Sequence, residues 1–463
     1  MSSDLSIEQR GALRGVERWN NRALFSLLWP LIIEQLLAVT MGAMDTIMVS
    51  SVGEHAVSAV NIIDNINNLL IIAFTALCTG GAVVVSQFIG RNDSGNSRLA
   101  SRQLFYCVTA LSLLMSVIAV LFRQPIIALI YGNIASDVME SASIYFLITA
   151  ISYPFLAIFN ANAALFRSVG NSRVTMLIAL LVNVLNIGGN AIFIYVLKIG
   201  VTGAAISTLV SRIIATVITT CMLTRNGGFV SLAGIGKKPH LVPSMIKNIL
   251  NVGIPSGLES SMFQIGRLMT QRIFTGFGTA AIAGNAVASV INSFSFQPGM
   301  AYGMSLITIV GQCVGAGDYD AAKKQTAKIM KLAYITLFIV SAAIYIFLEP
   351  LTSLFSLSPE AHQLAVSFLK IHCISMAIGW GFSFALPNAL RAAGDARFVM
   401  IAATLSMWLV RVSAAYLLTF TFGFGPLGVW LAMGADFVVR GTAYGIRWKS
   451  GKWMKQKVII SEQ

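Results

Sequence analysis

Apolar residues follow one another in twelve long stretches that polar segments separate. Most of these stretches contain at least the roughly 20 residues that an α-helix needs to cross the hydrocarbon core of a bilayer. Several are longer, which predicts tilted or kinked helices, or helices that extend beyond the bilayer. The pattern therefore predicts an all-α polytopic membrane protein. The expected spans lie at roughly 23–50, 56–89, 103–122, 138–163, 173–196, 201–224, 247–275, 280–313, 327–348, 362–389, 397–420 and 425–446.

Basic residues gather in every second loop. The loops after the even-numbered spans carry Arg91, Arg98, Arg102, Arg167, Arg173, Lys237, Lys238, Lys323, Lys324, Lys328, Arg391 and Arg397. The opposite loops carry only Arg123 and Lys198. Because cytoplasmic loops are enriched in Lys and Arg, this distribution predicts that both termini are cytoplasmic.

The chain contains one pattern twice. At one constant offset, Pro30 falls on Pro255 and Glu34 on Glu259; at an offset shorter by a single position, Arg167 falls on Arg391. The prolines either start spans 1 and 7 or kink them. Six spans in each half give both halves the same direction in the membrane. This duplication is typical of transporters whose two halves face each other across a substrate path.

The repeat and the polar segments predict five regions. They are a cytoplasmic N-terminal segment (1–22), an N-lobe (23–225), a cytoplasmic linker (226–246), a C-lobe (247–446) and a basic cytoplasmic tail (447–463). The N-terminal segment shows no cleavable signal peptide.

Composition agrees with a membrane protein, with 56% hydrophobic and only 11% charged residues. The net charge of +14 comes largely from the alternate loops and the two ends, so it does not indicate nucleic-acid binding. The five cysteines stand singly in apolar segments. This spacing indicates small buried residues rather than metal ligands.

Acidic residues inside spans are the first functional candidates, because a charge at bilayer depth is costly. Glu34 and Asp45 lie about three helical turns apart in span 1, on one helix face and about 16 Å apart along the axis. Span 7 repeats the first as Glu259 but has Thr270 in place of Asp45. We expect Asp45 to bind a coupling cation or proton; a structural hydrogen bond is the alternative.

The other acids leave two interpretations each. Glu34 and Glu259 either line the substrate cavity or clamp a cytoplasmic gate. Asp64 lies in the polar run NIIDNINN and either faces the central cavity or belongs to a polar cluster remote from lipid.

Span 5 carries Asn183, Asn186 and Asn190, of which the last two share a helix face. With Asp45 and Thr208 they would form an oxygen-rich pocket, which suits Na⁺ or a protonatable carboxylate. Ordinary interhelical hydrogen bonding is the alternative.

Basic and soft side chains inside the spans complete the candidates. Arg212, Arg267, Arg272, Lys370 and Arg411 are expected to pair in part with the acids, and Asp436 with Arg440, one helical turn further on. A pliable apolar cavity would suit varied amphipathic ligands. Its candidate wall residues are Met41, Met44, Phe263, Met269, Phe294 and Trp380.

Several short motifs, in this order and spacing, resemble the multidrug and toxic compound extrusion (MATE) transporters. They are MDTIMVSSVG (44–53), SQFIG (86–90), LFRSVGNSR (165–173), GIPSGLE (253–259) and GQCVGAGD (311–318). The resemblance implies two six-helix lobes, alternating access, and export of organic cations and other amphipathic compounds against Na⁺ or H⁺. It also implies that Asp45 is the span-1 site aspartate, with Asn186 and Thr208 beside it.

The chain departs from the family pattern in both lobes. Asn190 stands where the family often has an aspartate. Phe263 replaces the span-7 glutamate of NorM-like members, and span 10 has no acid between His372 and Arg391. We therefore expect ion coupling to centre on the N-lobe and Asp45, in a protein that is not a clean NorM-like member.

The resulting prediction is a monomeric, cation-coupled antiporter of a bacterial inner membrane that exports amphipathic, often cationic, compounds. Its expected partners are these small substrates and membrane lipids, without nucleic acid and without a cofactor beyond Na⁺ or H⁺. The alternative is a flippase for a lipid-linked substrate, which the arginines inside the spans would permit. An enzyme is disfavoured because no catalytic motif is evident, and a channel is disfavoured by the duplication.

Overall fold

The structure is a computed structural model that describes residues 19–132, 135–225, 227–235 and 240–459. These residues form helices and connecting segments, without a strand among them. They pack as two compact units, which meet in sequence inside one helix, α11. The N-terminal unit consists chiefly of Phe25–Gly257, and the C-terminal unit chiefly of Leu258–Val458.

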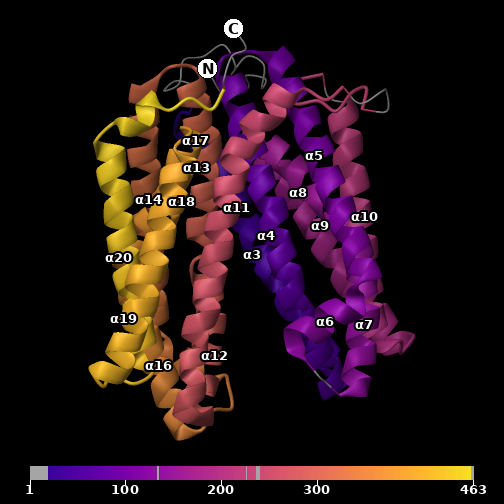
Figure 1. Cartoon of the computed structure of the whole chain (residues 1–463), viewed down its shortest axis with the longest axis vertical. Coiled ribbons are helices and arrows are strands. Elements are labelled where there is room, and N and C mark those ends of the chain that lie inside the picture. The colour runs from indigo at the N-terminus through magenta and orange to yellow at the C-terminus, as the bar shows by residue number, and fades with distance from the viewer. Residues whose placement is uncertain (1–18, 133–134, 226, 236–239, 460–463) are drawn as a thin grey trace. The chain divides into compact units, whose positions relative to one another are not determined.

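The N-terminal unit is a bundle of long helices with two shorter ones. Its elements are α3 (Asn21–Ser50), α4 (Glu54–Gly90), α5 (Ser94–Leu121), α6 (Arg123–Tyr131), α7 (Ser136–Ile151), α8 (Tyr153–Ser168), α9 (Ser172–Asn190), the π-helical η1 (Ala191–Val196), α10 (Gly200–Arg225) and the first half of α11 (Pro243–Arg272). Helices α4 and α5, α5 and α8, and α9 and α10 pack as neighbours (Figure 1). The bend of 44° between α7 and α8 falls at Ser152, just before Pro154.

The C-terminal unit contains more irregular helix. Its α-helices are α12 (Gly278–Ser295), α13 (Gln297–Gly315), α14 (Tyr319–Ile346), α15 (Leu348–Ser353), α16 (Pro359–Ser375), α17 (Leu386–Ala392), α18 (Ala396–Leu405), α19 (Ser413–Tyr416) and α20 (Leu427–Lys449). Its π-helical segments are η3 (Met376–Ala385), η4 (Ser406–Val412) and η5 (Leu417–Thr421), and its 3₁₀ turns are η2 (Ile273–Phe277) and η6 (Lys452–Lys455). Wide π turns are frequent at functional sites.

Every predicted span coincides with one helix or with consecutive helices, which confirms the predicted all-α fold. By length and composition, nine segments of the described chain are able to cross a membrane, or ten if α7 and α8 form one bent span. The short α6 and α15 lie between predicted spans. With 9 and 6 residues, they are too short to cross a bilayer.

The repeated prolines lie inside helices rather than at their starts. Pro30 falls within α3, which begins at Asn21, and Pro255 falls within α11, which begins at Pro243. Of the two interpretations, the structure therefore rules out a helix start. Each proline removes one backbone donor from the interior of its helix.

Close helix contact in the N-terminal unit depends on small residues. A Cβ atom at Gly80 would lie 2.3 Å from the carbonyl oxygen of Ile249, so only glycine lets α4 approach α11 this closely. Contacts through small residues are the usual way in which membrane helices pack without a hydrophobic driving force.

Candidate functional site

Asp45 of α3 and Asn190 of α9 form the centre of a polar site in the N-terminal unit. The Asn190 side-chain amide donates a hydrogen bond of 2.5 Å to Oδ1 of Asp45. Asn190 is fully buried and Asp45 is half-buried. The contact joins two helices that are far apart in the sequence, so it fixes the direction of the carboxylate.

Asn186 and Thr208 continue this site. The Asn186 side-chain amide donates to the Thr208 hydroxyl at 3.1 Å, and its backbone carbonyl accepts from Ser207 at 2.7 Å. Asn186 lies one helical turn before Asn190, the residue that contacts Asp45. The four residues predicted to form an oxygen-rich pocket therefore lie together on α3, α9 and α10.

Three amide oxygens on α9 are buried without a hydrogen-bond partner among the described residues. They are Oδ1 of Asn183, Asn186 and Asn190. An unpaired buried oxygen costs about 1–3 kcal/mol, so such oxygens call for a donor or a cation. One carboxylate with buried amide oxygens is a ligand set that suits a hard cation.

Asp64 of α4 lies in a second polar cluster of the same unit. Asn67 donates to Asp64 at 3.4 Å and accepts from the Tyr153 hydroxyl at 2.6 Å. Arg212 interacts electrostatically with both Asp64 and Asp45, and its guanidinium donates to Ser152 at 2.6 Å. The two acids thus share one basic residue.

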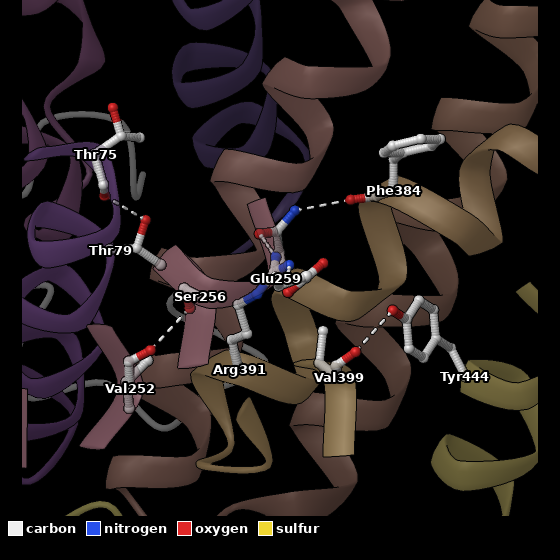
Figure 2. Close-up of polar contacts among 10 residues, drawn as sticks. Thr75, Thr79, Val252, Ser256, Glu259, Phe384, Arg391, Val399 and Tyr444 are labelled. Atoms are coloured by element: carbon white, nitrogen blue, oxygen red, sulfur yellow. Dashed lines mark hydrogen bonds and ion pairs between the residues drawn. The ribbon is translucent and has the colours of Figure 1, made fainter. Parts of the chain in front are cut away.

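Glu34 and Glu259 form matched ion pairs, each within its own unit. Glu34 accepts from Arg167 at 2.7 Å and from the Thr175 hydroxyl at 2.5 Å. Glu259 accepts from Arg391 at 2.6 Å, and the two side chains point toward each other in Figure 2. Repeat-equivalent acids therefore pair with repeat-equivalent arginines.

The C-terminal unit contains a cavity of about 500 Å³. Seven of its lining side chains are aromatic, and the others are aliphatic, polar or basic. The lining residues are Phe263, Arg267, Thr270, Gln271, Phe274, Thr275, Ile282, Asn285, Ala286, Ser289, Asn292, Ser293, Phe296, Met300, Trp380, Phe384, Arg411, Val429, Trp430, Met433 and Phe437. The π-helical η3 supplies Trp380 and Phe384, and η4 supplies Arg411.

One buried acid serves two arginines beside this cavity. Asp436 has no exposed surface and lies 3.5 Å from Arg440 and 3.9 Å from Arg411. It also accepts a hydrogen bond of 2.6 Å from Ser406. The Arg440 guanidinium stacks 4.3 Å from the centre of the Phe384 ring. The pair of Asp436 and Arg440 predicted on one helix is confirmed.

The remaining predicted cavity residues divide into two groups. Phe263 and Trp380 line the C-terminal cavity. Met41 packs against a small core in the N-terminal unit, and Met269 is 40% exposed and lies outside the cavity wall. His372 is buried and hydrogen-bonds Ser295 through Nε2 at 2.9 Å.

Sequence reasoning missed the partners of the paired acids. Arg167 and Arg391 are repeated as Glu34 and Glu259 are, so the duplication could have indicated that these residues pair. The hydrogen bond from Tyr153 to Asn67 had no such signal, because it joins single residues of α8 and α4.

A duplicated bundle of membrane-spanning helices, with polar sites held inside each unit, defines a multi-pass membrane transporter. The MatE family model matches residues 30–192 and 255–417. The two matched segments are equally long, and they are related by the same offset that places Pro30 on Pro255. The chain belongs to the MatE family.

Named relatives and a solved structure agree with this assignment. The chain is 29% identical over 438 residues to the uncharacterized transporter YisQ of Bacillus subtilis, covering 94% of this chain and 95% of the relative. It is 28% identical to a probable multidrug resistance protein NorM of Thermotoga maritima, covering 96% and 95%. A crystal structure of MATE in the bent conformation superimposes with a TM-score of 0.87 at 19% identity, over 97% of this chain and 98% of that one.

Proposed function

We propose that the protein is a cation-coupled antiporter that exports amphipathic, often cationic, organic compounds across a bacterial inner membrane. It works as a monomer with both termini in the cytoplasm. Membership of the MatE family and the names of multidrug resistance relatives support the export of such compounds. The coupling ion, Na⁺ or H⁺, binds at Asp45.

The observation that carries this proposal is the set of polar groups around the Asp45 carboxylate. Its carboxylate accepts from Asn190 at 2.5 Å, and α9 presents buried amide oxygens that lack partners within the described residues. A cation with oxygen ligands would satisfy the amide oxygens of Asn186 and Asn190 together with the carboxylate. Alternatively, a proton on Asp45 would turn the carboxylate from an acceptor into a donor toward one of them.

Coupling follows from the charge of this site. A bound cation or proton neutralises Asp45 and removes its electrostatic interaction with Arg212, which also reaches Asp64. The occupied and empty sites then favour different arrangements of α3, α9 and α10. An ion that binds one conformational state better than the other shifts the equilibrium between them, and transport is the consequence of that coupling.

Dye uptake into everted membrane vesicles tests the proposal, with Na⁺ and pH gradients imposed separately. Wild-type vesicles should accumulate ethidium when one gradient is present. The Asp45→Asn variant should reach the membrane in normal amount but accumulate no more dye than vesicles without the protein. Collapse by external Na⁺ and not by a protonophore would identify Na⁺ as the coupling ion; the reverse would identify H⁺.

A matched variant controls for the loss of any carboxylate. Asp137→Asn removes an exposed acid in the first turn of α7 of the same unit, and it should leave uptake unchanged. Normal gradient-driven uptake by the Asp45→Asn variant would exclude ion coupling at this site.

A further inference from the structure

The C-terminal cavity lies where the repeat places the counterpart of the Asp45 site. The offset that relates Pro30 to Pro255 also places Thr270 at the position of Asp45 and Arg411 at the position of Asn186. Both Thr270 and Arg411 line the cavity. The duplication therefore replaces a carboxylate by a hydroxyl and an amide by a guanidinium, which reverses the polarity of the pocket.

The charges of the cavity wall are all positive. Arg267 and Arg411 line it, and no aspartate or glutamate does so in the part of the chain that the structure describes. Asp436, the acid that lies beside Arg411, also serves Arg440. Arg267 has no ion-pair partner among the described residues, and it repels Arg411 electrostatically.

Two arginines in a cavity wall without an acid cost free energy unless a bound anion or another partner compensates their charge. Arg411 is 7% exposed and stands near the middle of the segment Ala396–Thr421, which is long and apolar enough to span a membrane. Basic residues at this depth face partners or a cavity and mark ligand paths. A structural role would be complete with Arg411, Arg440 and Asp436, so it leaves Arg267 unexplained.

The apolar part of the wall contains a stack of three aromatic rings, called the aromatic stack below. The rings of Phe296, Trp380 and Phe384 stack in sequence, with centroids 6.1 and 5.0 Å apart and interplanar angles of 18° and 23°. Asn285 and Asn292 of α12 add polar groups to the wall. A cavity of about 500 Å³ is within the range that holds a drug-sized molecule.

We propose that this cavity binds an amphipathic organic anion. An apolar body lies against the aromatic stack, and a carboxylate, sulfonate or phosphate head group contacts Arg267 and Arg411. Guanidinium groups bind such heads through charge-assisted hydrogen bonds. As a transported substrate class this rests on the proposed function, whereas the binding step itself needs no ion gradient.

Equilibrium dialysis with the full chain in zwitterionic lipid nanodiscs tests the charge preference. The probes are naphthalene-1-sulfonate and the trimethylammonium derivative of the same ring, which differ in the sign of the head group. The wild-type protein should bind the sulfonate at least about tenfold more tightly than the ammonium, as expected for a charged hydrogen-bond partner. Equal affinity, or a preference for the ammonium, would overturn the proposal.

Arg267→Gln is the decisive variant, because Arg267 has no acidic partner to lose within the described chain. It should weaken sulfonate binding about tenfold and leave ammonium binding unchanged or stronger. Arg272→Gln removes an exposed arginine from the end of α11 that does not line the cavity, and it should bind like the wild type. If Arg267→Gln retains the wild-type affinity for sulfonate, as the Arg272→Gln control should, the arginine-lined cavity is not an anion site.

Two further arms identify the source of the anion. Nanodiscs that contain phosphatidylglycerol should weaken sulfonate binding if an anionic lipid occupies the cavity, and should leave it unchanged if the occupant is soluble; the anion site stands in both cases. Because dialysis is done without a gradient, the Arg267→Gln result is independent of the Asp45→Asn uptake result. If one of the two experiments contradicts its prediction, the other still tests its own.

Discussion

The two units of this transporter use one scaffold for opposite chemistry. In the N-terminal unit, Asp45 faces an amide and buried amide oxygens, a set that favours a cation. In the C-terminal unit, the equivalent region is an aromatic cavity with two arginines and no acid among its described lining residues. The difference lies in side chains at repeat-equivalent positions, such as Asp45 and Thr270, and in the π-helical segments η3 and η4 that supply part of the cavity wall.

What the units share is equally informative. Glu34 with Arg167, and Glu259 with Arg391, form the same ion pair in both. Asp93 and Asp318 cap α5 and α14 in the same way, each accepting a hydrogen bond of 2.9 Å from a backbone N–H in the first turn of its helix. Pairs and caps of this kind stabilise helices. The duplication thus repeats the residues that hold each unit together, and it differs at the residues of the two proposed binding sites.

The largest effect is expected at Asp436, because the C-terminal unit concentrates its buried charge there. Asp436→Asn leaves Arg411 and Arg440 without a counter-charge. Loss of one partner from a buried ion pair costs about 3–5 kcal/mol, so the variant should unfold at a markedly lower temperature. Thermal unfolding of the purified protein in detergent measures this.

An exposed acid provides the control for that experiment. Asp320 lies 3.6 Å from Lys323 with its side chain 86% exposed, so Asp320→Asn should leave the unfolding temperature unchanged. If Asp436→Asn unfolds at the same temperature as Asp320→Asn, Arg411 and Arg440 do not need Asp436 as a counter-charge.

Most of the fold followed from the sequence because its signals are local or periodic. The twelve apolar stretches can be recognised in the sequence by their length, and the duplication divides them into two sets of six. The exceptions are positions where tertiary contact decides. Apolar length alone does not reveal the break at Ser152 or the π-helical turns of η3 and η4.

The candidate site was only partly predictable. Asn186 and Asn190 share a helix face, so their joint approach to Asp45 could be expected once α3 lay beside α9. The aromatic cavity could be predicted only in part. Phe263 and Trp380 are predicted wall residues and line it. Their meeting with Arg267 and Arg411 could not be expected, because three separate segments, α11, η3 and η4, supply these residues with no common spacing. Sequence paired Arg440 with Asp436. It did not show that Arg411 shares this acid, or that Arg267 has no acidic partner in the described structure.

A moderate and equal effect is expected at the shared ion pairs. Glu34→Gln and Glu259→Gln each leave an arginine with its side chain 17% and 13% exposed. Since water reaches both pairs in part, each variant should lose about 2 kcal/mol, less than a fully buried pair. Unfolding in a denaturing detergent series measures both in parallel.

Exposed glutamates give one control in each unit. Glu54→Gln at the start of α4 and Glu360→Gln at the start of α16 should change stability by less than about 0.5 kcal/mol. A loss at Glu34 that exceeds the loss at Glu259 by more than about 1 kcal/mol would show that the two units do not share this element of the scaffold.

The smallest effect on stability, and the most specific one on binding, is expected at Gly299 of α13. A Cβ atom there would lie 2.2 Å from the Trp380 ring, so Gly299→Ala must displace the middle ring of the aromatic stack. Overpacking of this kind costs about 1–2 kcal/mol. The variant should also bind naphthalene-1-sulfonate several-fold more weakly, since the aromatic stack that contacts the ligand is displaced while both cavity arginines remain. Gly445→Ala in α20 meets nothing within 4 Å and should match the wild type in both measurements. Unchanged sulfonate affinity in Gly299→Ala would mean that the ligand does not lie against Trp380, and the contrast between the units would then rest on charge alone.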